Sequence, residues 1–133
     1  MVRVLPIAVA FALFLVAVIV MADMGRLGPL QEVYTFRYGD KAGHFVMLGV
    51  FTLLVDLALF QLVPRKSPYA LVLLSGAAIG ALIGLEELSQ LWMPRRNPDV
   101  FDLLASYAGI ASASLLALAF RGTVTKQARR RTA

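Results

Sequence analysis

Long apolar stretches separated by short polar segments dominate the pattern of this chain. Residues 4–22 and 70–85 contain no charged side chain. Residues 43–63 contain one, Asp56, and residues 100–120 contain one near their start, Asp102. A membrane-spanning helix needs about 20 predominantly apolar residues. The pattern therefore predicts an all-α, polytopic membrane protein in which four transmembrane helices form a small bundle.

The first apolar stretch also has features of a secretory signal peptide. Arg3 precedes it, and Val20-Met21-Ala22 resembles a cleavage site. The apolar part of a signal peptide is usually about 7–15 residues long. Because this stretch is longer, we expect it to remain as a membrane span.

The composition supports a membrane protein and excludes several other classes. Hydrophobic residues make up 59% of the chain and charged residues 16%, against roughly 45–50% and 25% in average globular chains. This apolar content excludes a disordered chain. The absence of cysteine excludes a disulfide scaffold, a Cys-ligated zinc site and an iron–sulfur centre. We expect no cofactor, and we divide the chain into a membrane domain, residues 1–120, and a basic cytoplasmic tail, residues 121–133.

The basic residues predict the orientation of the four spans. An even number of spans places both termini on one side, and eight of the 13 basic residues fall on that side. They are Arg3, Arg65, Lys66, Arg121, Lys126, Arg129, Arg130 and Arg131. The positive-inside rule then predicts that both termini are cytoplasmic. The net charge of +5 thus reflects membrane topology, and we expect no nucleic-acid partner.

Small residues at helical spacing predict close helix contacts. The third span carries two consecutive G-x-x-x-G steps, and the fourth carries Gly109 one turn after a polar residue. The steps on the third span are Gly76, Gly80 and Gly84. Small residues at this spacing allow another helix to approach closely. We expect the glycine stripe of the third span to face the stripe of the fourth that contains Asp102, Ser106 and Gly109.

Polar side chains gather where the second, third and fourth spans reach the predicted outer membrane face. We call this set the polar cluster: Asp40, Lys41, His44, Glu87, Gln90, Arg96, Asp102 and Ser106. Helical phase turns Glu87 toward the glycine stripe and turns Glu86 away by roughly a quarter turn. Charged residues within a membrane are rare and usually face the protein interior. We therefore expect Arg96 to pair with Glu87 or Asp102, and Glu86, Arg95 and Asp99 to form a solvated rim.

Asp56 lies apart from the polar cluster. It follows His44 by twelve residues, which places it about 18 Å deeper along the helix. A charged aspartate at such a depth costs on the order of 3 kcal/mol. Three alternatives remain open: Asp56 is protonated, it pairs with a group on another helix, or it faces a partner.

Two motifs within residues 40–110 resemble those of VanZ-like membrane proteins. Asp40-Lys41-Ala42-Gly43-His44-Phe45 is similar to that family's D-K-x-x-H-F motif. Glu87-x-x-Gln90, followed by Arg96, Asp102 and Gly109, is similar to its E-x-x-Q…R…D-x-x-x-N-x-x-G run. Ser106 stands where the family usually has asparagine, and Leu48 where it often has tyrosine. The resemblance implies a bacterial cell membrane and a role in the cell envelope, in a family linked to teicoplanin resistance, but it supplies no reaction.

Three functions fit these residues, and the one we favour is a non-enzymatic membrane module. In it, Lys41, Arg95 and Arg96 bind an anionic membrane lipid or a lipid-linked envelope precursor, because arginine suits bidentate phosphate contact. Glu87, Gln90 and Asp102 would hold these cations in place. The first alternative is a small accessory subunit of a larger membrane complex or a homo-oligomer, which the glycine stripe and Asp56 would suit.

The second alternative is a membrane enzyme acting on a lipid-linked substrate. His44 and Glu87 would then be an acid–base pair, and Arg96 would stabilise developing negative charge. The sequence supplies no clear nucleophile, because Ser106 has no adjacent base by spacing. His44, Glu87 and Asp102 have the composition of a zinc or manganese site, but their spacing is not that of a metal motif and we expect no metal.

Overall fold

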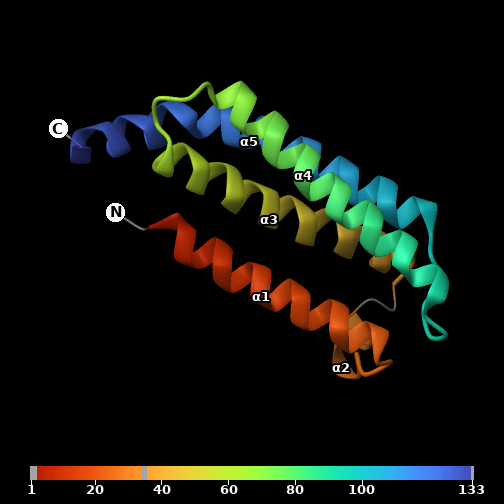
Figure 1. Cartoon of the computed structure of the whole chain (residues 1–133). Helices are drawn as coiled ribbons and strands as arrows, with labels where there is room; N and C mark the ends of the chain where they lie inside the picture. Colours follow the sequence, from red (N-terminus) through yellow and green to blue (C-terminus); the bar gives the residue numbers. More distant parts are fainter. Residues whose placement is uncertain (1–2, 34–35, 133) are drawn as a thin grey trace.

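Four long helices run side by side in an elongated bundle (Figure 1). The computed structural model describes residues 3–33 and 36–132 of the chain. The long helices are α1 (Val4–Asp23), α3 (Gly39–Leu62), α4 (Pro68–Ser89) and α5 (Val100–Thr132). A short helix, α2 (Pro29–Val33), precedes α3, and a 3₁₀ turn, η1 (Gln90–Trp92), extends α4. Neither was expected from the hydrophobic pattern.

All four long helices are long and apolar enough to cross a membrane. The corresponding spans are Val4–Asp23, Gly39–Leu62, Pro68–Trp92 and Val100–Gly122. The prediction of an all-α bundle with four membrane spans is therefore confirmed. Helix α5 continues past the end of the last span at Gly122, so residues 121–132, predicted as a tail, continue the same helix. Ala133 and the side chains of Arg129 and Arg131 lie outside the described residues.

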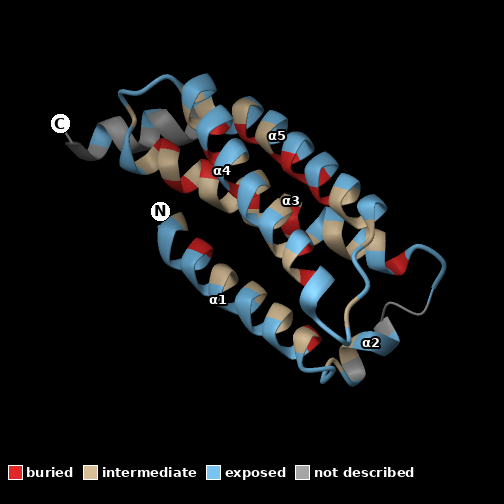
Figure 2. Cartoon of the chain, turned by 45° about the vertical axis from the view of Figure 1, so that its right-hand side comes forward, coloured by how far each residue is buried: buried red, intermediate tan, exposed pale blue. Residues whose placement is uncertain are grey.

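Helix α3 is the centre of the bundle, and α5 is the helix it contacts most. Figure 2 shows buried residues where α3, α4 and α5 face one another, whereas α1 is mostly exposed. Two apolar clusters fill the contact. Leu48, Ile79 and Ile110 form one, and Phe60, Val72 and Ala117 form the other, nearer the two termini. Exposed leucines such as Leu73 and Leu115 suit an outer surface that faces lipid, because lipid chains are as apolar as leucine.

The expected contact between the two small-residue stripes is wrong. A Cβ atom on Gly109 would collide with the backbone of Phe45 and lie 3.2 Å from the nitrogen of Gly49. Gly109 therefore marks the place where α5 touches α3, not α4. The glycine stripe of α4 does face α5, but there it accommodates the ring of Tyr107: a Cβ on Gly80 would lie 3.5 Å from that ring. Between α3 and α5, Gly49 packs against Gly109. Between α4 and α5, Gly80 packs against the ring of Tyr107.

Candidate functional site

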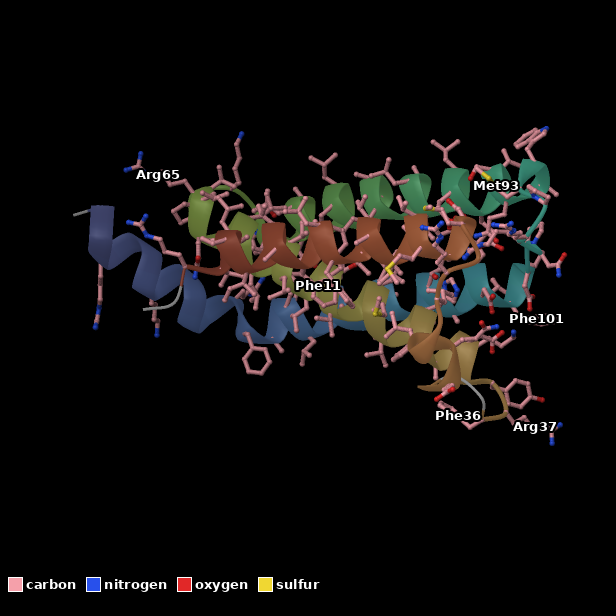
Figure 3. All side chains as sticks on the ribbon, turned by 90° about the horizontal axis from the view of Figure 1, so that it is seen from below. Phe11, Phe36, Arg37, Arg65, Met93 and Phe101 are labelled. Atoms are coloured by element: carbon pink, nitrogen blue, oxygen red, sulfur yellow. The ribbon has the colours of Figure 1, made fainter. Side chains whose placement is uncertain are left out.

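Polar side chains from four segments meet at one end of the bundle, which we call the polar end. Figure 3 shows nitrogen and oxygen atoms gathered there, beside the labelled Met93 and Phe101. The end of α1, the start of α3, the end of α4 and the loop into α5 all contribute to it. The opposite end, which carries Arg65 and both termini, we call the basic end (Figures 1 and 3).

Lys41 lies at the centre of three carboxylates at the polar end. Its Nζ atom donates to Asp40 Oδ2 at 3.0 Å, to Asp99 Oδ2 at 2.9 Å and to Asp102 Oδ1 at 3.0 Å. An ammonium group has three hydrogens to donate, so one goes to each carboxylate. Oxygens of the same three carboxylates lie within 4.8 Å of one another, a spacing that suits a metal ion. The lysine ammonium takes the place of such a cation.

Asp99 also fixes the start of α5. Its Oδ1 atom accepts a hydrogen bond from the backbone N–H of Phe101 at 2.8 Å, as an N-cap residue does. The hydrogen bond from Lys41 holds the pKa of the Asp99 carboxyl below its usual value, and the bond from Phe101 lowers it further. Asp99 had been assigned to the solvated rim. Its position directly before an apolar helix, three residues ahead of Asp102, is the signal that identifies it as a cap.

His44 lies between Ser106 and Asp102, both on α5. Its Nδ1 atom is 3.3 Å from Ser106 Oγ, and its Nε2 atom is 3.7 Å from Asp102 Oδ2. The order hydroxyl, imidazole, carboxylate is that of a hydrolase triad, and spacing along the chain had given no sign of it. Ser106 is fully buried within α5, however, where a substrate does not reach its hydroxyl. The contact joins α3 to α5 and does not present a nucleophile.

Glu87 and Gln90 are the buried members of the polar cluster on α4 and η1. Glu87 Oε1 accepts the backbone N–H of Asp99 at 2.7 Å, and Glu87 Oε2 accepts from Gln90 Nε2 at 3.3 Å. Gln90 Nε2 also donates to both carboxyl oxygens of Glu86, at 3.0 and 3.1 Å. These bonds tie the end of α4 to the loop that enters α5.

Arg96 does not form the ion pairs predicted for it. Its guanidinium lies 3.5 Å from Glu86 Oε1 and 3.7 Å from Asp23 Oδ1, and it forms no ion pair with Glu87 or Asp102 among the described residues. Glu86 is not a rim residue either, because its side chain is only 18% exposed. The 3₁₀ turn after α4 carries Arg96 back over Glu86, and helical phase alone could not anticipate that turn. Arg96 thereby connects α4 to the end of α1.

The polar end has more carboxylates than cations, and the three cations nearest the polar cluster are already engaged. Six carboxylates gather there: Asp23, Asp40, Glu86, Glu87, Asp99 and Asp102. The three nearest cations are Lys41, Arg96 and Arg95, and Arg95 donates to the backbone oxygen of Met24 at 2.6 Å. Arg26 and Arg37 lie at the same end with exposed side chains. An anionic ligand would have to displace these partners and approach an excess of negative charge. The polar cluster is arranged as a set of mutual contacts rather than as an anion site.

The basic end carries a hollow of about 450 Å³ that the sequence did not indicate. We call it the basic pocket, and Phe60, Val63, Pro64, Arg65, Lys66, Ser67, Pro68, Leu71, Arg121, Gly122 and Lys126 line it. Four of the lining residues are cationic and none is acidic. The guanidinium of Arg121 also lies 4.8 Å above the ring of Tyr69, a cation–π distance. Most of the other lining residues are apolar, so the pocket combines apolar and cationic side chains.

Comparisons of the chain with protein-family models, with curated proteins and with solved structures found no match.

Proposed function

We propose that the chain is a non-enzymatic, VanZ-like, multi-pass protein of the bacterial cytoplasmic membrane that binds an anionic lipid or a lipid-linked component of the cell envelope. The basic pocket is its headgroup site, and the polar cluster holds the ends of the four helices together. The motifs around Asp40 and Glu87 support the family and the envelope setting. The excess of basic residues at the end with both termini supports a cytoplasmic location for that end.

The observation that carries this proposal is the different state of the cations at the two ends. Lys41 and Arg96 at the polar end have carboxylate partners, whereas no acidic residue lines the basic pocket. Basic pockets at the cytoplasmic ends of membrane helices are suited to phosphate-bearing headgroups. Arg65 and Arg121 can contact phosphate oxygens in bidentate fashion, while the apolar lining residues receive the first part of an acyl or isoprenoid chain.

A second candidate, an accessory subunit of a membrane complex, is favoured by one observation. Helix α1 packs mainly against α3. Only 6% of the residues in its membrane-spanning segment are buried inside the bundle. The rest of its apolar surface is free to contact either lipid or another membrane protein. The experiment below separates the two candidates by what stays bound to the purified chain.

The test is native mass spectrometry of the protein in mild detergent mixed with phosphatidylglycerol or phosphatidylcholine. We expect the protein to retain phosphatidylglycerol preferentially. The double variant Arg65→Gln/Lys66→Gln should bind it about 30-fold more weakly, because each basic residue contributes about 1 kcal/mol near an anionic headgroup. The matched control is Arg26→Gln/Arg37→Gln, which removes two positive charges at the polar end and should leave the affinity unchanged.

Three results would change the proposal. Equal weakening in both double variants would mean that net charge alone attracts the lipid. Competition by inorganic phosphate would indicate that the pocket recognises free phosphate without the lipid chain. A second protein bound in fixed stoichiometry, with no lipid preference, would favour the accessory subunit.

A further inference from the structure

Asp56 joins three membrane-spanning helices through its two carboxyl oxygens. The residue lies on α3 and is fully buried. Its Oδ1 atom is hydrogen-bonded to Ser75 Oγ on α4. Its Oδ2 atom accepts a hydrogen bond from Ser114 Oγ on α5 at 2.9 Å. Complete burial removes one alternative left open by the sequence, that Asp56 faces a partner.

The surroundings of Asp56 contain no compensating positive charge. No cation among the described residues lies within ion-pair distance of it. The facing segments of the neighbouring helices, residues 4–22, 70–85 and 103–120, contain no charged residue. The apolar cluster of Phe60, Val72 and Ala117 lies one turn closer to the basic end and separates Asp56 from the basic pocket. A carboxylate here would be a buried charge without a counterion, which is strongly unfavourable.

A proton on Asp56 would give every hydroxyl around Ser75 its own acceptor. Ser75 Oγ lies within hydrogen-bond distance of both Asp56 Oδ1 and the backbone oxygen of Val72, the latter at 3.2 Å. A serine hydroxyl has one hydrogen to donate, so an ionised Asp56 and the Val72 oxygen would compete for it. With a proton on Oδ1, Asp56 donates to Ser75, Ser75 donates to Val72, and Ser114 donates to Oδ2. Each of the three hydrogens then has one acceptor.

We infer that Asp56 is a proton-binding site, held as a neutral carboxylic acid between α3, α4 and α5. The bound proton makes a deep acidic residue compatible with the membrane and turns it into a hydrogen-bonding junction among three helices. This role is independent of headgroup binding at the basic pocket, so either can fail without the other.

The test is infrared spectroscopy of the whole protein in lipid bilayers at pH 8, with and without ¹³C-labelled aspartate. The other four aspartates, at positions 23, 40, 99 and 102, lie at the polar end, away from the membrane interior. We expect a carbonyl band of a protonated acid that shifts with the label and is absent from Asp56→Asn. The band should persist in the matched control Asp40→Asn. If the wild-type protein shows only carboxylate bands from aspartate, the inference is wrong.

Two further measurements keep the test decisive. Ser75→Ala removes the acceptor of the proton, so the carbonyl band of the otherwise unchanged Asp56 should shift in frequency even if Asp56→Asn fails to fold. Replacing sodium by potassium should leave the band unchanged. A carboxylate band that forms only in sodium would mean that Asp56 and its hydroxyl neighbours hold a metal cation instead. The unpartnered hydroxyl of Thr52, one turn away, would then be the next oxygen to examine.

Discussion

The two ends of the bundle both collect charged side chains, but they use them in opposite ways. At the polar end, Lys41 and Arg96 are surrounded by carboxylates from several segments. At the basic end, Arg65 and Arg121 line a hollow that contains no acidic side chain. A high number of charged residues in one part of a sequence therefore does not by itself locate a ligand site. Under the proposed function, the site lies where cationic side chains have no acidic partner in the chain.

The two arrangements also differ in what they contribute to stability. Glu87 and Gln90 at the polar end are almost completely buried, so their hydrogen bonds must be kept, because an unsatisfied buried group costs about 1–3 kcal/mol. The cations of the basic pocket repel one another and contribute little to folding. Apart from the contact of Arg121 with the Tyr69 ring, we expect their favourable interactions to come from anions outside the chain, such as those of a membrane surface. Substitutions at the polar end should therefore affect folding, and those at the basic end should affect binding.

The largest expected difference in stability is between two glycine-to-alanine substitutions on α5, at Gly109 and at Gly122. Gly109→Ala should destabilise the protein by about 1–3 kcal/mol or more, because the new Cβ meets the backbone of Phe45, which cannot move aside as a side chain can. Gly122→Ala at the basic end has nothing within 4 Å, and it should be neutral or stabilise the helix by up to about 1 kcal/mol. Thermal unfolding of both variants in detergent measures the contrast. Equal stability would show that α3 and α5 are further apart at Gly109 than described.

A matched pair of lysine variants separates folding from binding. Lys41→Met leaves three carboxylates facing one another without their shared cation, so it should clearly lower the unfolding temperature. Lys66→Met should leave that temperature unchanged and weaken phosphatidylglycerol binding about fivefold, the effect of roughly 1 kcal/mol. Unfolding and lipid binding are measured on both proteins. The comparison between the ends breaks down if both variants lose stability, or if Lys41→Met alone loses lipid.

Sequence reasoning recovered the spans because their signal is local. Twenty apolar residues in a row predict a membrane helix whatever surrounds them, and residues 4–22 and 100–120 begin or end within two residues of the spans observed. Helical phase and spacing were weaker guides to contacts between helices. They placed Gly109 against α4, although the closest approach is to Gly49 of α3, because phase describes one helix and not where its neighbours lie.

At the polar end, too, the spacing of residues along the chain did not predict which side chains meet. The sequence placed the polar cluster at one membrane face, and the structure brings His44, Ser106 and Asp102 together there. It did not predict that Glu86 pairs with Arg96, since that contact depends on a turn of three residues after α4. The basic pocket was missed for a related reason. Its cations come from a loop and from a distant helix end, and they had been explained already as topology signals.

The smallest expected effect is an acid-induced loosening confined to the polar end. The hydrogen bond from Lys41 holds the pKa of Asp99 below its ordinary value, which is about 3.9 in an unfolded chain. For a carboxyl whose pKa is lowered by folding, the stabilisation is present above the unfolded pKa and is lost as the pH falls through the folded one. Above about pH 4 the contact between Lys41 and Asp99 should therefore stay intact, and it should weaken only as the pH falls further. The change should be modest, because exposed ion pairs contribute little.

Spin labels on single cysteines measure this effect, since the chain has no cysteine of its own. A label at Asn97, in the loop before α5, should become more mobile only as the pH falls below about 4 in phosphatidylcholine bilayers. A label at Ser67 should not, because no carboxylate lines the basic pocket there. Lys41→Met should remove most of the pH dependence at Asn97, since it deletes the donor responsible for the lowered pKa. Equal mobilisation at both positions would instead indicate that acid loosens the whole bundle. The ion pairs of the polar end would then not be what fixes the loop before α5.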